Sequence, residues 1–294
     1  MRKELFAAML AVLVLAGCEK GENELSEIDP STETTQMKKF VFTVKGDWSK
    51  STMKAPAKAG ETLRADNKEM TDLWLLDYMD GVLIQQLHQT PTDDDWGIPS
   101  LSLKFGEHHI YFIASRGESP LLNTELGNIT WETVRDTFWK DYAVEVKQSS
   151  NGNRSVTLDR VVTRARFTIQ DAIPDNVTSI VLTADRWYKG MNYRTGAMAE
   201  PVSLNSEISI PDSYHGTTGR SIVVYSLSGA TSWSANMTLT ARNSTNEDIY
   251  SVSLSEVPFE RNSTTTCSGR MFSAGTTTTV TLDSEWGSDI QYEW

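Results

Sequence analysis

The stretch TDLWLLDYMDGVLIQQLHQ (residues 71–89), followed after a loop by SLSLKFGEHHIYFIASR (residues 100–116), decides the fold. Residues 73–79 are apolar at both sets of alternating positions, which is typical of a central strand packed on both faces. Asp80-Gly81 then separates this run from the apolar residues 82–84, and Asp-Gly between two apolar runs is a strong hairpin signal. No helical crossover interrupts the stretch, so it predicts antiparallel β-structure.

Alternating runs continue on both sides of this stretch. Phe40, Phe42 and Val44 alternate with polar residues and predict the first strand. Further strands are expected at residues 158–169, 179–183, 207–210, 221–227, 236–241, 249–252 and 277–282. Because these runs are separated by Gly, Pro and Asn turns, they predict a Greek-key sandwich. One short helix is expected over residues 131–138, where Trp131, Val134 and Phe138 have helical spacing.

The length of the chain and one turn predict two domains. A chain of 294 residues suits two domains of ordinary size, and the turn SSNGN at residues 149–153 comes directly before a new run of strands. The expected boundaries are residues 1–17 for a signal peptide, 18–36 for a tether, 37–156 for an N-terminal β-sandwich and 157–294 for a C-terminal β-sandwich.

The N-terminus resembles a bacterial lipoprotein signal peptide. Met1-Arg2-Lys3 is basic, and the apolar run from Leu5 to Gly17 is shorter than the ~20 residues that span a bilayer. The run ends in Leu15-Ala16-Gly17-Cys18, where small residues precede a cysteine. We therefore expect cleavage between Gly17 and Cys18 and acylation of Cys18. The polar, acidic residues 19–36 lack apolar periodicity and are expected to form a flexible tether.

Several motifs carry a family resemblance. DLWLLDYMDGVLIQ (residues 72–85), LSLKFGEHHIYFIASRG (residues 101–117) and LDRVVTRARFTIQDAIPDNVTSIVL (residues 158–182) resemble the fimbrillin superfamily, the subunits and lipid-anchored base proteins of type V pili. The chain is most similar to the fimbrillin-associated anchor lipoproteins. The resemblance implies two tandem transthyretin-like β-sandwich domains, pilin partners bound by β-strand exchange, and a lipid-anchored position on the outer membrane at the base of a fimbrium.

The resemblance also implies candidate sites. In the stalk subunits a protease cuts after an arginine between the first strand and the rest of the domain, and Arg64-Ala65 resembles that site. The alternative is an uncut surface loop, which the anchor branch implies. Ile290, Tyr292 and Trp294 alternate with polar residues near the C-terminus and form the candidate strand-exchange segment. The acidic residues after Cys18 resemble a surface-export signal, with a merely solvated linker as the alternative. The sequence leaves anchor, stalk and tip roles open.

Composition and motifs disfavour most other classes of function. The formal net charge of −12 disfavours binding to nucleic acid. If Cys18 is acylated, only Cys267 is left, and we expect it to be a buried, unreactive thiol. His108 and His109 would point to opposite faces of a strand, so they cannot bind one metal ion together. We expect no metal, no cofactor and no enzymatic activity. The sequence alone does not exclude two carboxylates that the fold brings together in the geometry of a glycosidase.

A glycan-binding lipoprotein is the alternative function. Trp187, Tyr188 and Tyr193 lie in the segment RWYKGMNYRTG (residues 186–196), and aromatic rings stack on sugars. The competing interpretation is that these rings fold back onto the sandwich as part of its core.

Overall fold

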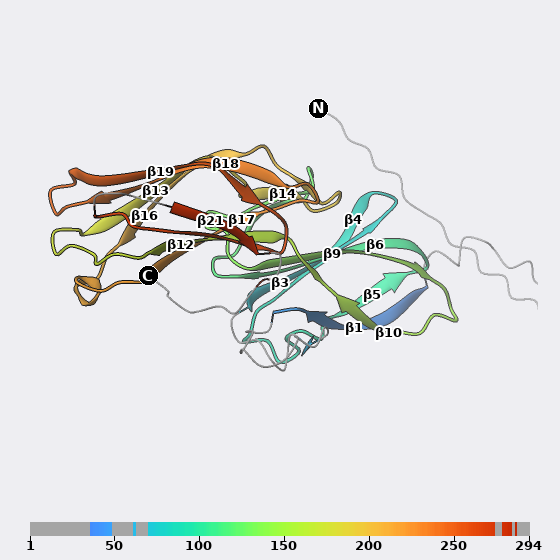
Figure 1. The fold of residues 1–294 in the computed structure, drawn as a ribbon. Helices are drawn as coiled ribbons and strands as arrows, with labels where there is room; N and C mark the ends of the chain where they lie inside the picture. The colour runs from blue at the N-terminus through green and yellow to red at the C-terminus, as the bar shows by residue number, and fades with distance from the viewer. Residues whose placement is uncertain (1–35, 49–60, 63–69, 274–277, 284–285, 287–294) are drawn as a thin grey trace, which may run out of the picture.

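Strands dominate the structure (Figure 1). The computed structural model describes residues 36–48, 61–62, 70–273, 278–283 and 286. Within them the one helical element is a single 3₁₀ turn, η2 (Asp212–Tyr214), so the prediction of an all-β fold is confirmed. No helix in these described ranges has the length and apolar character needed to cross a bilayer.

Two sheets enclose the N-terminal core. The first contains β1 (Met37–Gly46), β2 (Glu61–Thr62), β5 (Ser100–Lys104) and β10 (Asn153–Thr157). The second runs in the order β11 (Asp159–Arg160), β9 (Thr137–Val146), β6 (Gly106–Arg116), β3 (Met70–Met79) and β4 (Val82–Gln89). Apolar side chains from both sheets form one core between them. β3 lies between β6 and β4, as its two-faced apolar pattern predicts.

The hairpin between β3 and β4 confirms the turn predicted at Asp80-Gly81. Asp80 and Gly81 have φ angles of 51° and 77°, which is the left-handed region that a tight two-residue hairpin requires. Met79 and Val82 are paired on either side of the turn. Glycine adopts positive φ without steric cost, which explains its place at this turn.

β1 lies in the middle of its sheet and confirms the predicted first strand. Residues 41–45 pair in parallel with β10, and residues 37–41 pair antiparallel with β5. The amides of Phe42 and Val44 donate to carbonyls of the loop at residues 97–99, which extends the pairing beyond β5. The inward-facing side chains of the strand are fully buried. β1 is therefore held by hydrogen bonds along both edges and by the core beneath it.

Two further sheets enclose the C-terminal core. One has the order β17 (Arg220–Leu227), β12 (Val162–Ile169), β20 (Thr264–Gly269) and β21 (Thr278–Asp283). The facing sheet has the order β16 (Val202–Ser209), β13 (Ser179–Trp187), β18 (Trp233–Arg242) and β19 (Asp248–Phe259). Cys267 lies in the core between them, and burial raises the pKa of its thiol to about 12, so the expectation of an unreactive cysteine fits the structure.

A small sheet and a third core connect the two halves. The sheet is made of β15 (Ala197–Met198), β14 (Gly190–Asn192), β8 (Asn128–Thr130) and β7 (Leu121–Asn123). The third core combines residues such as Tyr111 and Ile113 of β6 with Met191 and Leu227. β11 still belongs to an N-terminal sheet and β12 to a C-terminal one, so the change of sheet falls between residues 160 and 162. The domain boundary expected between residues 156 and 157 stays a prediction.

The helix expected over residues 131–138 is wrong. Residues 131–136 form an irregular connection, and Phe138 lies in β9. Trp131 and Val134 are buried in the third core, whereas Phe138 is buried in the N-terminal core. Their spacing therefore reflects burial in two separate places. The segment is rich in threonine, valine and aromatic residues, which favour extended structure. A helix of this length is also unstable unless tertiary packing stabilises it.

The buried face of β1 generates the first prediction. We expect Phe42→Ala to lower the free energy of unfolding by about 3–5 kcal/mol, because it leaves a cavity in a closed core. The control Val82→Ala removes a side chain that is 62% exposed and should change the value by less than about 0.5 kcal/mol. Urea unfolding measures both. Equal effects of the two substitutions would contradict the central position of β1.

Candidate functional site

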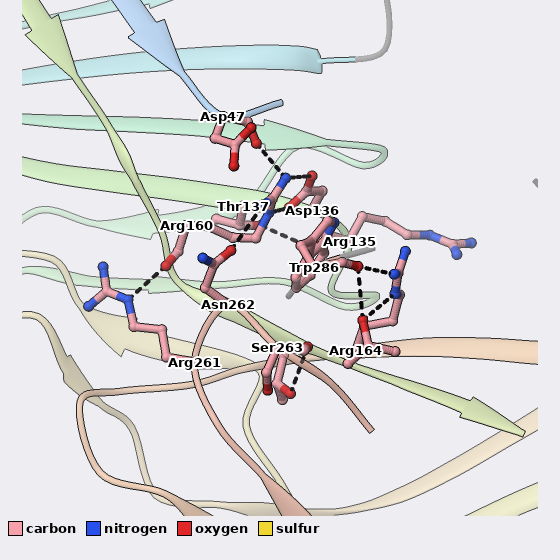
Figure 2. A network of polar contacts seen from close by, with 12 residues as sticks. Asp47, Arg135, Asp136, Thr137, Arg160, Arg164, Arg261, Asn262, Ser263 and Trp286 are labelled. Carbon is pink, nitrogen blue, oxygen red and sulfur yellow. Dashed lines mark hydrogen bonds and ion pairs between the residues drawn. The ribbon is translucent and has the colours of Figure 1, made fainter. Parts of the chain in front are cut away.

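Arg160, in β11, is the polar centre of the contact between the two halves (Figure 2). Its Nε donates to Oδ1 of Asp136 at 2.7 Å, and its Nη2 donates to Oδ2 at 3.0 Å. The two side chains are only 3% and 8% exposed. A buried ion pair is maintained when its geometry is good and further hydrogen bonds satisfy the remaining donors and acceptors.

The remaining donors of Arg160 reach two other parts of the chain. Nη2 donates to the backbone carbonyl of Asp47, directly after β1, at 2.6 Å. Nη1 donates to Oδ1 of Asn262, between β19 and β20, at 3.0 Å. The guanidinium also lies 4.6 Å from the ring centroid of Phe138 and 4.0 Å from that of Trp286. Arg160 therefore links the end of the first strand to the C-terminal sandwich.

Two more arginines extend this network (Figure 2). Nε of Arg164 donates to the hydroxyl of Thr264 at 3.0 Å, and its Nη2 donates to the backbone carbonyl of Trp286. Nε of Arg261 donates to the carbonyl of Arg160 at 2.7 Å, and burial lowers the pKa of the Arg261 guanidinium. These donors all bond to groups of the chain itself. The network therefore acts as a connector between segments.

Most of the predicted site residues fall outside the described residues. They are Gly17 and Cys18 of the signal-peptide cleavage and lipidation site, Arg64 and Ala65 of the candidate protease site, and Ile290, Tyr292 and Trp294 of the candidate strand-exchange segment. These assignments stay predictions.

The aromatic rings expected to contact a glycan are mostly buried. Trp187 and Tyr193 are 1% and 0% exposed. Nε1 of Trp187 donates to the carbonyl of Tyr225 at 3.0 Å, and the hydroxyl of Tyr193 lies 2.7 Å from that of Tyr78. Tyr188 is half-buried. A buried ring offers no face to a sugar, so the geometry contradicts glycan contact by Trp187 and Tyr193. The segment folds back because β14 pairs with β8 of the N-terminal half.

The two adjacent histidines lie on opposite faces of β6, as predicted. His108 is buried, with Nδ1 2.7 Å from Oδ1 of Asp77 and Nε2 2.9 Å from the carbonyl of Lys104. His109 is exposed, with Nδ1 3.0 Å from Oδ1 of Asp141. Burial lowers the pKa of His108, but the hydrogen bond and the charge of Asp77 outweigh burial and raise it overall. In the part of the chain that the structure describes, no three metal-binding side chains gather.

A cleft of about 770 Å³ lies where β16 and β17 meet the connection at residues 132–136. Its lining combines apolar residues with charged residues of both signs: Arg116, Glu132, Arg135, Asp136, Lys189, Leu204, Glu207, Ile208, Ile222 and Val224. Sequence reasoning missed both this cleft and the Arg160 network, because their residues are far apart in the chain. The arginines within the apolar run LDRVVTRAR were the one available signal, since a charge in a buried strand requires a partner.

The Arg160–Asp136 pair generates the second prediction. Arg160→Ala removes both guanidinium hydrogen bonds to the buried carboxylate of Asp136, breaks the buried ion pair from one side, and should lower the free energy of unfolding by about 3–5 kcal/mol. Arg160→Lys should not restore stability, because an ammonium group cannot reproduce the planar fork of donors. The matched control is Lys140→Ala, which breaks an exposed pair with Asp159 and should cost at most about 1 kcal/mol. Equal losses in urea unfolding would contradict the role of Arg160.

The His108–Asp77 pair generates a pH prediction. Because the pKa of His108 is higher in the folded state, the stabilisation is fully present below the unfolded pKa of about 6.5 and is lost as the pH rises through the folded pKa. The free energy of unfolding should therefore fall as the pH rises from 6 to neutral and above. His108→Gln should flatten this slope, and His109→Gln should leave it. An unchanged slope in His108→Gln would show that the His108–Asp77 pair does not cause the pH dependence of stability.

Two comparisons concern the sequence and its family. Residues 124–294, more than half of the chain, match a family of unknown function, DUF6562. A search of curated proteins found no match.

Solved structures are similar over nearly their whole length. A candidate adhesin from Bacteroides ovatus is 11% identical, with 88% of this chain and 99% of that chain covered and a TM-score of 0.53. A candidate polysaccharide-binding protein from Bacteroides thetaiotaomicron is 10% identical, with coverages of 86% and 98% and a TM-score of 0.54. The tip fimbrial protein Mfa3 from Porphyromonas gingivalis is 12% identical, with coverages of 84% and 99% and a TM-score of 0.42.

The first two of these structures show a shared fold. It is the all-β fold that the resemblance to the fimbrillin superfamily implied, and that expectation is confirmed. Because the family model matches more than half of its residues, the chain belongs to the DUF6562 family.

Proposed function

We propose that this chain is a surface-exposed lipoprotein that anchors or helps to assemble a fimbrium, and that it binds neighbouring pilins by β-strand exchange. The lipoprotein motif at residues 15–18 supports attachment to the outer membrane. The fold shared with candidate adhesins supports a role in adhesion at the cell surface. The proposed role is not enzymatic and involves no cofactor and no nucleic acid.

The placement of β1 is the observation that carries this proposal. If Cys18 holds the lipid, the chain from the membrane enters the folded body through β1. A pull on the anchor then acts along a strand that is hydrogen-bonded on both edges and buried on one face. Each hydrogen bond contributes only about 0.5–1.5 kcal/mol, but they must break together with loss of the core contacts.

The same placement explains how strand exchange would work. Removal of β1 would expose the edges of β10 and β5 and leave a groove lined by the N-terminal core. An extended segment of another chain can bind such a groove through main-chain hydrogen bonds, with side-chain pockets that set its register. The candidate donor is the segment with Ile290, Tyr292 and Trp294. A stalk subunit requires release of β1, whereas a base anchor requires its retention.

The Arg160 network favours retention. The bond from Arg160 to the carbonyl of Asp47 fixes the end of β1 to the core between the two halves. Arg160 is itself held by its buried ion pair with Asp136. Release of β1 would therefore have to break this contact as well as the strand pairing. We therefore assign the anchor role to this chain. Glycan capture is the weaker alternative, because two of its three candidate rings are buried.

The anchor role predicts that the mature chain on cells is acylated at Cys18 and uncut after Arg64. Intact mass and N-terminal sequencing of membrane-extracted protein measure this. The Arg64→Lys variant, which an arginine-specific protease does not cut, supplies the reference mass. Cys18→Ala should abolish labelling with palmitate.

Two results would overturn parts of this account separately. A major species that begins at Ala65 would identify a polymerising stalk subunit in place of an anchor. Unchanged palmitate labelling of Cys18→Ala would remove the lipoprotein assignment.

A further inference from the structure

The cleft between β16 and β17 is lined by the free edges of two strands. Each of these strands ends its own sheet, because β17 pairs only with β12 and β16 pairs only with β13 (Figure 1). The two sheets are the layers of the C-terminal sandwich, so the cleft lies on an open side of that sandwich. Such a side offers main-chain hydrogen bonds at its edges and apolar side chains between them.

The edge of β17 carries hydrogen-bonding groups that the described chain does not use. The amide of Ser228 donates to the carbonyl of Val161 at the end of the ladder between β17 and β12. In an antiparallel ladder the even-numbered residues of β17 therefore bond to β12, and the odd-numbered ones point to the cleft. The carbonyl of Tyr225 accordingly accepts from Nε1 of Trp187. Within the described residues, no hydrogen bond reaches the amide or the carbonyl of Val223.

Apolar side chains lie between the two edges. Leu204 of β16 and Ile222 of β17 are buried, whereas Ile208 and Val224 are only partly buried at the surface of the C-terminal core. Successive side chains of a strand point to opposite faces. A strand with an apolar residue at every second position could therefore cover Ile208 and Val224 with one face and present its other face to water.

Trp286 brings the chain to this cleft. Asp283, the last residue of β21, pairs with Thr264 of β20. Three residues further on, the carbonyl of Trp286 accepts hydrogen bonds from the hydroxyl of Thr264 and from Nη2 of Arg164 (Figure 2). The ring of Trp286 lies 6.1 Å from the ring of Tyr225, which lines the cleft. The chain therefore crosses its sheet from β21, over β20 and β12, to the end strand β17.

We propose that residues 287–294 of the same chain bind in this cleft as an additional strand, antiparallel to β17. The segment reads GSDIQYEW and lies outside the described residues. It would start beside Tyr225 and run back along β17, with one face directed at the apolar side chains of the cleft: Ile290, Tyr292 and Trp294. This binding is a property of the single chain and does not depend on strand exchange, although the groove of a pilin would compete for the same segment.

Length and attachment select this occupant. Eight extended residues reach about 26 Å, and the eight residues of β17 span the same distance. The segment follows directly on Trp286, which is already fixed beside the cleft. A tethered segment is present at a high effective concentration, whereas a separate partner must first lose its freedom of movement.

Charge adds to this selection. The lining contains three basic and three acidic residues: Arg116, Arg135, Lys189, Glu132, Asp136 and Glu207. Because Asp136 is paired with Arg160, which is not part of the lining, the cleft keeps an excess of positive charge. In the part of the chain that the structure describes, Arg135 and Lys189 form no ion pair. The segment supplies the carboxylates of Asp289 and Glu293, whereas a net charge of −12 disfavours the approach of a second copy.

Photo-cross-linking of the purified full-length chain tests this binding. The photoreactive residue benzoylphenylalanine replaces Tyr292, so that an aromatic side chain is kept on the apolar face of the segment. We expect adducts at residues 204–209 of β16 or 222–225 of β17, which line the cleft. The product should have the mass of one chain, and its yield should not depend on protein concentration.

Two matched variants test whether the segment binds with the proposed face. Ile290→Asp places a carboxylate against the apolar side chains and should lower the yield of these adducts at least about fivefold. Gln291→Asp adds the same charge on the opposite face of the segment and should leave the yield within about twofold. Equal yields for the two variants would overturn the inference.

The other possible occupants have outcomes of their own. A product of twice the chain mass would identify a second copy, and a product with a different protein would identify a separate partner. Either result, adducts confined to residues outside the cleft, or no adduct at all would overturn the inference. None of them would decide the anchor role, which is tested separately at Cys18 and Arg64.

Discussion

Hydrogen bonding along both edges of β1 is the constraint on which the N-terminal sandwich depends. β1 joins β10, which comes from the end of that half, to β5 from its middle, so the sheet loses continuity if β1 leaves. Its buried side chains also fill the core against β3 and β6. The N-terminal strand is thus a central element of the fold. In a protein tethered from its N-terminus, that position decides whether the tether holds or the strand can be exchanged.

The connection between the two halves gives β1 a second point of attachment. Arg160 bonds to the carbonyl of Asp47, to Asp136 and to Asn262, which belong to three separate parts of the chain. The surrounding apolar residues of the third core come from both halves. Force applied at the N-terminus would therefore reach the C-terminal sandwich through a buried cation and its apolar surroundings. This coupling is the physical reason to favour an anchor over a subunit that releases its first strand.

Local patterns predicted most of the elements, and distant contacts decided the rest. The two-faced apolar run at residues 73–79 and the Asp80-Gly81 turn predicted the central hairpin correctly, because both signals depend on adjacent residues. The helix expected over residues 131–138 was wrong, since burial in two cores imitated helical spacing. The Arg160 network could not be predicted, because its partners are distant in sequence. For the segment at residues 186–196 the sequence left two interpretations open, rings that contact a glycan and rings that fold back onto the core, and the structure buries Trp187 and Tyr193.

Amide hydrogen exchange of the native protein tests the central claim most directly. If β1 is a permanent central strand, the amides of residues 41–45 exchange only through global unfolding and are as slow as those of β6. Exchange at β1 about tenfold or more faster than at β6 would show local release of the strand. That result would contradict a retained first strand, and with it the anchor role.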